Sequence, residues 1–167
     1  MNLPLLAERP PEIAVNLNPA LTATVIGHSV SAYVASPDNP QHSGMPFLLA
    51  FLILPLALHE DSRDVMPPTR STRLQMWLSE HGEILHGFAE RARWLASYTR
   101  EGLIFGAHLG ILQLPSDGLV KPGSATVGEP PTGDLTKPII AAAKLVGRWF
   151  AQVPDSAAVF QILGVKP

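Results

Sequence analysis

The chain has no cysteine among its 167 residues. This absence excludes disulfide bonds, catalysis by a thiolate and cysteine-bound zinc, and it fits a reducing compartment. Charge is also scarce: charged residues make up 16% of the chain, against about 25% in an average soluble domain. The 14 acidic residues outnumber the 12 basic ones, which gives a net charge of −2. No general positive field attracts nucleic acid or anionic lipid, so any contact with DNA has to be local.

Three sequence features that would define a location or a cofactor are also missing. The longest apolar run, residues 45–58, falls short of the roughly 20 residues of a membrane helix, and Pro55 would leave a carbonyl unpaired in lipid. Residues 1–10 lack the basic leader of a secretory signal. No Gly-x-x-x-x-Gly-Lys-Ser/Thr loop is present to cradle a nucleotide phosphate. We expect a cytoplasmic protein with no membrane partner and no cofactor.

Apolar residues, by contrast, make up 46% of the chain. A chain of this length can bury one core without disulfide or metal support, so we expect a single domain over residues 1–167. Residues 45–58 are apolar on every side, which predicts a buried central helix kinked near Pro55. With so little charge, some of the remaining apolar surface is expected to meet a partner.

Periodicity and capping residues predict a mainly α fold. Asn18 and Pro19 suit the cap and first position of a helix over residues 19–35, whereas residues 10–15 are expected to be extended or a short turn. Gly102 and Gly106 predict a close helix approach, because glycine inside a helix otherwise costs stability. Further helices are predicted over residues 72–82, 83–95, 99–109, 136–150 and 156–164.

One β-hairpin is predicted in this compact helical domain. Residues 111–114 and 119–121 flank a turn whose Gly118 accepts a positive φ, and residues 122–133 form a surface loop. Three helices followed by a hairpin give a winged-helix-like segment around residues 72–121. Arg100 and Lys121 are its candidate contacts with nucleic acid, but so few basic groups favour a protein-contact module over a DNA reader.

Residues 27–31, Gly-His-Ser-Val-Ser, resemble the nucleophile elbow of a hydrolase, with Ser29 as the nucleophile. Ser31 occupies the position of the second glycine, and the helix that begins after Asn18 is already under way. A helical serine that faces solvent, or bonds a carbonyl one turn back, is therefore favoured over a catalytic one.

Two groups of histidine and acidic residues have the spacing of metal or acid–base sites. The first group, Glu83, His86 and Glu90, has the helical spacing i, i+3 and i+7. No second helix carries a matching set, so a solvated or ion-paired face is favoured over a metal site. In the second group, His59 could bond the last carbonyls of the central helix. This role is favoured over metal binding or catalysis. We predict no catalytic, cofactor or metal site from these groups: Glu83, His86 and Glu90; His59, Glu60, Asp61 and Asp64.

Trp149 and Phe150 follow Arg148 near the end of the helix predicted over residues 136–150. Adjacent aromatic rings at this spacing are either part of the core or the anchor of a partner-binding surface. With the core interpretation favoured, these three residues remain the candidate partner-binding residues.

Several segments, in their order along the chain, resemble one family. They are Glu-Arg-Pro-Pro-Glu-Ile at 8–13, Asn-Pro at 18–19, Leu-Pro-Leu-Ala-Leu-His at 54–59, Pro-Thr-Arg-Ser-Thr-Arg at 68–73, Phe-Ala-Glu-Arg-Ala at 88–92, Tyr-Thr-Arg-Glu at 98–101, Gly-Arg-Trp-Phe-Ala at 147–151 and the closing residues 160–167. Over nearly its whole length the chain resembles the middle component of bacterial three-component ABC systems.

This resemblance implies two partners: an SMC-like ABC ATPase and a third component, encoded beside it in systems thought to defend against invading DNA. It implies no catalytic residues. The expected function is a non-catalytic adaptor subunit between the ATPase and the third component, with DNA touched only indirectly or weakly. A winged-helix DNA-binding subunit of the same complex is the alternative, and a small hydrolase is the third.

Overall fold

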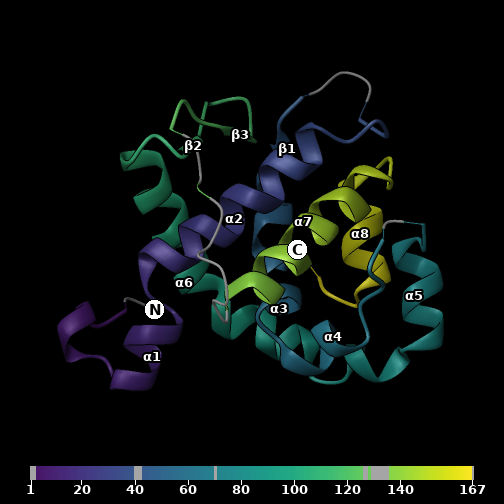
Figure 1. Cartoon of the computed structure of the whole chain (residues 1–167), viewed down its shortest axis with the longest axis horizontal. Helices are drawn as coiled ribbons and strands as arrows, with labels where there is room; N and C mark the ends of the chain where they lie inside the picture. The colour runs from purple at the N-terminus through teal and green to yellow at the C-terminus, as the bar shows by residue number, and fades with distance from the viewer. Residues whose placement is uncertain (1–2, 40–42, 70, 126–127, 129–135, 167) are drawn as a thin grey trace.

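The computed structural model describes residues 3–39, 43–69, 71–125, 128 and 136–166. Within them the fold is mainly helical with a small antiparallel sheet, which confirms the predicted class (Figure 1). With η marking a 3₁₀ helix, the elements are η1 (Leu6–Glu8), α1 (Pro11–Asn16), α2 (Pro19–Val34), β1 (Met45–Pro46), η2 (Phe47–Leu52), α3 (Ile53–Ala57), α4 (Glu60–Asp64), α5 (Leu74–Glu80), η3 (Gly82–Leu85), α6 (Phe88–His108), β2 (Leu112–Gln113), β3 (Leu119–Pro122), α7 (Thr136–Ala151) and α8 (Ser156–Ile162). None of the helices described is long and apolar enough to cross a membrane.

Helix α2 organises the packing, because both long helices α6 and α7 lie against it (Figure 1). Its start is as predicted: the side chain of Asn18 accepts a hydrogen bond from the Leu21 amide at 2.8 Å, and Pro19 occupies the first turn. Gly102 of α6 and Gly147 of α7 bring the two helices close to the α2 backbone. The close approach predicted for the glycines of α6 is confirmed.

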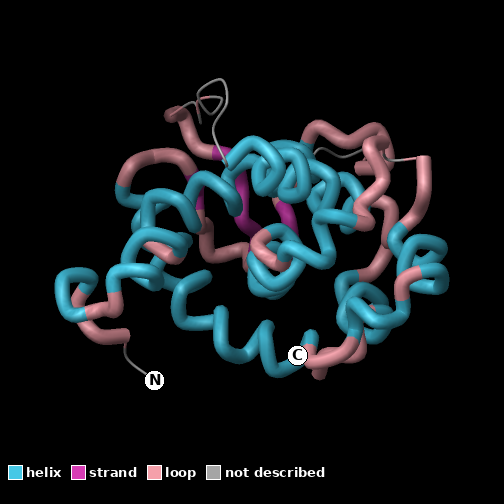
Figure 2. The backbone as a smooth tube through the Cα atoms, turned by 60° about the horizontal axis from the view of Figure 1, so that its bottom comes forward, coloured by secondary structure: helices cyan, strands magenta, loops and turns pink. Residues whose placement is uncertain are grey.

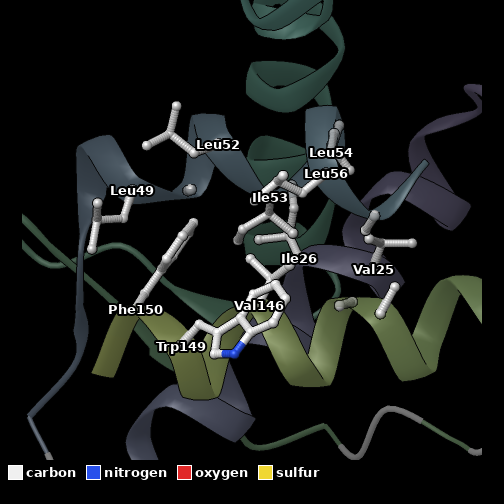
Figure 3. Packing of buried hydrophobic residues seen from close by; sticks show 14 of the residues in the cluster. Val25, Ile26, Leu49, Leu52, Ile53, Leu54, Leu56, Val146, Trp149 and Phe150 are labelled. Atoms are coloured by element: carbon white, nitrogen blue, oxygen red, sulfur yellow. The ribbon is translucent and has the colours of Figure 1, made fainter. Parts of the chain in front are cut away.

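Residues 45–58 lie at the centre of the core, as predicted, but they do not form one kinked helix. They divide into β1, η2 and α3. Pro55 is the third residue of α3, where a backbone N–H has no partner within the helix, so a proline interrupts nothing. Figure 3 shows side chains of η2 and α3 packed against those of α2 and α7: Val25, Ile26, Leu49, Leu52, Ile53, Leu54, Leu56, Val146, Trp149 and Phe150.

Helix α6 is continuous over 21 residues, whereas the sequence predicted two helices over residues 83–95 and 99–109. Thr99, the first residue of the second predicted helix, is fully buried, and its hydroxyl donates to the Leu95 carbonyl at 3.1 Å. A threonine satisfied one turn back does not interrupt a helix. The real break is Gly87, which has φ 66° between η3 and α6. Two α-helices with a 3₁₀ turn between them therefore precede the hairpin, not the three helices of the predicted winged-helix-like segment.

The predicted hairpin is confirmed, and β1 adds a third strand to it (Figure 2). Strand β2 pairs antiparallel with β3, and Gly118 in the turn has φ 76°. On the other edge of β3, Met45 of β1 lies opposite Val120. This pairing joins segments about 75 residues apart, and only a long-range contact could have revealed it.

The secondary structure predicted near the N-terminus was wrong, whereas the helices predicted near the C-terminus are confirmed. Residues 10–15 were predicted as extended or a short turn, yet the six-residue helix α1 forms there because Pro11 stands at the first helical position, which tolerates a missing N–H. Near the C-terminus α7 and α8 are as predicted, and the Asp155 side chain caps α8 by accepting from the Ala157 amide at 3.0 Å. Most of the loop predicted over residues 122–133 lies outside the described residues.

Candidate partner-binding surface

Ser29 does not stand on a nucleophile elbow. It lies within α2 with no exposed surface, and His28 beside it is 6% exposed. No strand-to-helix turn presents the hydroxyl, and the α7 backbone at Gly147 passes directly over the Ser29 carbonyl. The expected alternatives, a serine facing solvent or bonding a carbonyl, are also not observed, because the Ser29 hydroxyl has no hydrogen bond within the described structure.

Glu83, His86 and Glu90 do not share a helix face. Glu83 belongs to η3, His86 follows that turn, and Gly87 with its positive φ separates both from Glu90 in α6. Glu83 lies 3.4 Å from the His81 ring nitrogen. In the part of the chain that the structure describes, no three histidine or acidic side chains are placed to hold a metal ion.

His59 caps the start of α4 instead of bonding the end of the central segment. Its Nδ1 accepts from the Ser62 amide at 3.3 Å and lies 2.9 Å from the Ser62 hydroxyl. The carbonyls at the end of α3 are taken by two arginines: Arg63 donates to the Ala57 carbonyl at 3.1 Å and Arg91 to the Pro55 carbonyl at 3.2 Å. Guanidinium groups suit this role because they are always charged and carry five donors.

The cap makes stability depend on the charge of His59. Burial lowers the pKa of His59, as do the Arg91 and Arg63 charges, while Asp61 opposes the shift. Because the folded pKa lies below the ordinary value of 6.5, the unfolded chain takes up this proton first as pH falls. The stabilisation is complete above about pH 7 and is lost as the pH falls toward the folded pKa.

We expect His59→Ala to lower the free energy of unfolding by about 1 kcal/mol near neutral pH, the usual effect of losing a cap. His59→Asn keeps a hydrogen-bond acceptor at the cap but does not titrate. We expect this variant to be as stable as the wild type near neutral pH and to retain the stabilisation by the cap at about pH 5, where the wild type loses it. Urea denaturation of the three proteins at both pH values measures this difference. Equal pH dependence in wild type and His59→Asn would show that protonation of His59 is not coupled to folding.

Trp149 and Phe150 are both fully buried, so the structure places these candidate anchor residues in the core. Trp149 donates its ring N–H to the Thr72 carbonyl at 2.7 Å and lies 4.9 Å, centroid to centroid, from Trp77. Both rings lie on the face of α7 that packs against α2 and α3, where the helical period places them beside Val146. Arg148, which directly precedes Trp149 on α7, is half-buried.

The two candidate nucleic-acid contacts lie in different settings. Arg100 is exposed on α6, with its guanidinium carbon 5.6 Å from the centre of the Phe51 ring. Lys121 in β3 is paired with Asp117 of the preceding turn at 2.7 Å, and this hydrogen bond lowers the pKa of Asp117. Of the two cations, Arg100 is therefore the more available to a partner.

Large apolar side chains are exposed on α6 and on η2, which packs against it. Trp94 is 50% and Ile104 69% exposed on α6, and Phe47 of η2 is 37% exposed. Phe47 meets Phe51 edge to face at 5.5 Å, and the Phe51 ring in turn lies beneath Arg100. We call these five side chains the α6 surface. The sequence held a signal for two of its members, since Trp94 and Ile104 fall outside the buried stripe of α6.

A hollow of about 660 Å³ adjoins the α6 surface. Glu101, which lines this hollow, is held in place by Arg9. The Arg9 side chain is buried, at 6% exposed, and donates to both carboxylate oxygens of Glu101, at 2.6 and 2.8 Å. The hydrogen bond to Glu101 raises the pKa of Arg9 despite burial, and the Arg9 guanidinium also lies 5.6 Å from the Tyr98 ring. The hollow is lined by Leu3, Pro19, Ser97, Arg100, Glu101, Ile104, Phe105 and His108.

Taken together, these observations define a small helical protein with exposed apolar and aromatic side chains on α6 and η2. The family model of the ABC-three component (ABC-3C) system Middle Component 3 matches residues 6–167, nearly the whole chain. The chain belongs to this family, as its resemblance predicted, and is a component of a three-component system. No curated protein and no solved structure matches it.

Proposed function

We propose that this chain is a non-catalytic adaptor subunit that links an SMC-like ABC ATPase to the third component of its system. The role would be carried out in the cytoplasm, in defence against invading DNA. Membership of the middle-component family supports the proposal, because it implies partner components. The α6 surface is the observation that carries it.

Its composition suits contact with a protein. Tryptophan and arginine are enriched among the residues that dominate binding energy, and the α6 surface holds both Trp94 and Arg100. Ile104 is 69% exposed, so a partner could bury most of it for a gain of roughly 1.5–3 kcal/mol. Phe51, already ordered by contacts with Phe47 and Arg100, would lose little freedom on binding.

The test is substitution within this surface. Ile104→Glu places a charge where the adaptor would bury an apolar side chain, so we expect at least tenfold weaker binding to the co-encoded ATPase or third component. Met76→Glu is the matched control, because Met76 is also exposed, at 58%, but lies on α5. Co-purification followed by titration of the purified components measures the effect. Equal loss in both variants, or none in either, would contradict the proposed surface.

Direct DNA binding is the alternative, and the exposure of Arg100 is what favours it. A DNA-binding subunit would lose affinity on Arg100→Ala and Lys121→Ala, and the salt dependence of binding would become shallower by roughly one unit per phosphate contact removed. The adaptor proposal expects neither change. Titration of a labelled DNA duplex at several salt concentrations distinguishes the two.

A further inference from the structure

A second surface lies on the other long helix packed against α2. Between α7 and residues 63–68 is a hollow of about 340 Å³, and a neighbouring hollow of about 440 Å³ shares Pro68 and Arg148 with it. We call the two hollows together the α7 groove. No residue lining it also lines the hollow beside the α6 surface.

The charges lining the α7 groove are all positive. Arg63, Lys144 and Arg148 line the hollow of about 340 Å³, and no carboxylate is among the described residues that line either one. Lys144 and Arg148 are four residues apart on α7 and therefore share a face. Arg63 is oriented by its hydrogen bond to the Ala57 carbonyl, and Arg148 forms no ion pair within the described residues.

The walls between these cations are apolar and stiff. Met66 and Leu145 contribute apolar side chains, and Pro67, Pro68 and Pro138 have no backbone N–H to offer a ligand. Recognition in the hollow of about 340 Å³ therefore depends on its cationic side chains and on apolar contact, and the hollow of about 440 Å³ adds two hydroxyl side chains. A carboxylate bound beside such walls is less screened than one on open surface, which strengthens its pairing with arginine.

We propose that the α7 groove binds a short acidic segment of a partner protein, with its carboxylates on Arg148 and Lys144 and its apolar side chains against Met66 and Leu145. This inference rests on the proposed adaptor function and gives the adaptor a second, chemically different surface. A nucleic acid fits less well, because its backbone needs an extended positive field. The chain carries a net charge of −2, and α4 adds acidic side chains directly beside Arg63.

The test uses the full chain and a fluorescent synthetic peptide of alternating glutamate and leucine, followed by anisotropy. Arg148→Glu should weaken its binding at least tenfold, and Lys144→Gln should weaken it severalfold. Lys137→Gln is the matched control, because Lys137 is exposed on the same helix but does not line the α7 groove. A peptide with glutamine in place of glutamate should bind at least tenfold more weakly than the acidic peptide.

Equal affinity of wild type and Arg148→Glu for the acidic peptide, or equal affinity of wild type for the two peptides, would overturn the inference. So would tighter binding of a DNA oligonucleotide that depends on Arg148, which would assign the groove to nucleic acid. Thermal unfolding of each variant confirms that it is folded. The adaptor function is tested in a separate experiment, which measures whether the wild-type chain co-purifies with its partner components.

Discussion

Gly147→Ala is expected to lower the free energy of unfolding by about 2–4 kcal/mol, a large effect for one added methyl group. A Cβ at this position would collide with the Ser29 carbonyl oxygen and would lie 2.9 Å from its carbon. Both are backbone atoms of α2, so neither can turn away as a flexible side chain would. Alanine is otherwise the better helix former by about 1 kcal/mol, so a net loss can come only from the close approach.

Gly82→Ala is the matched control, because no atom lies within 4 Å of a Cβ built at Gly82. We expect this variant to retain the stability of the wild type within about 0.5 kcal/mol. Urea denaturation followed by circular dichroism measures both. If Gly147→Ala proved as stable as the control, α7 and α2 would not be packed at the distance described.

Trp149→Ala should cost about 3–5 kcal/mol, because it removes a fully buried ring from the contact of α7 with Trp77. Trp149→Phe keeps a ring but loses the hydrogen bond to the Thr72 carbonyl, so a smaller loss of about 1–3 kcal/mol is expected. Trp94→Ala serves as the exposed control and should change stability by less than about 1 kcal/mol. Chemical denaturation of the three variants gives the comparison.

The same variants separate the two interpretations of the aromatic pair at the end of α7. If Trp149 were a surface anchor, Trp149→Ala would leave stability unchanged and weaken binding to a partner component. The buried position of Trp149 predicts a loss of stability for Trp149→Ala, and the proposed role of the α6 surface predicts a loss of binding for Trp94→Ala. A loss of binding for Trp149→Ala together with a loss of stability for Trp94→Ala would contradict both the described core and the α6 surface.

The sequence predicted most accurately the features that depend on neighbouring residues. Asn18 caps α2 as expected, since an N-cap needs only a short polar side chain and the amides of the next turn. Gly118 adopts the positive φ expected in the hairpin turn. These interactions span a few residues, so local sequence contains them.

Features that depend on distant segments could not be predicted in the same way. The division of residues 45–58 follows from the pairing of β1 with β3, which the apolar run itself does not encode. The Arg9 and Glu101 pair joins residues 92 positions apart, and it shapes the hollow beside the α6 surface. Arg100 was proposed as a nucleic-acid contact from its charge and its place in the predicted winged-helix-like segment, but its contact with Phe51 places it beside an exposed apolar side chain pair.

The central claim is that this chain connects two other components. The most direct measurement is native mass spectrometry of the co-encoded ATPase and third component, purified with and without this chain. The account predicts one assembly containing all three proteins, which the ATPase and third component do not form by themselves. An ATPase that binds the third component equally well in the absence of this chain, or a chain that remains monomeric beside both, would contradict it.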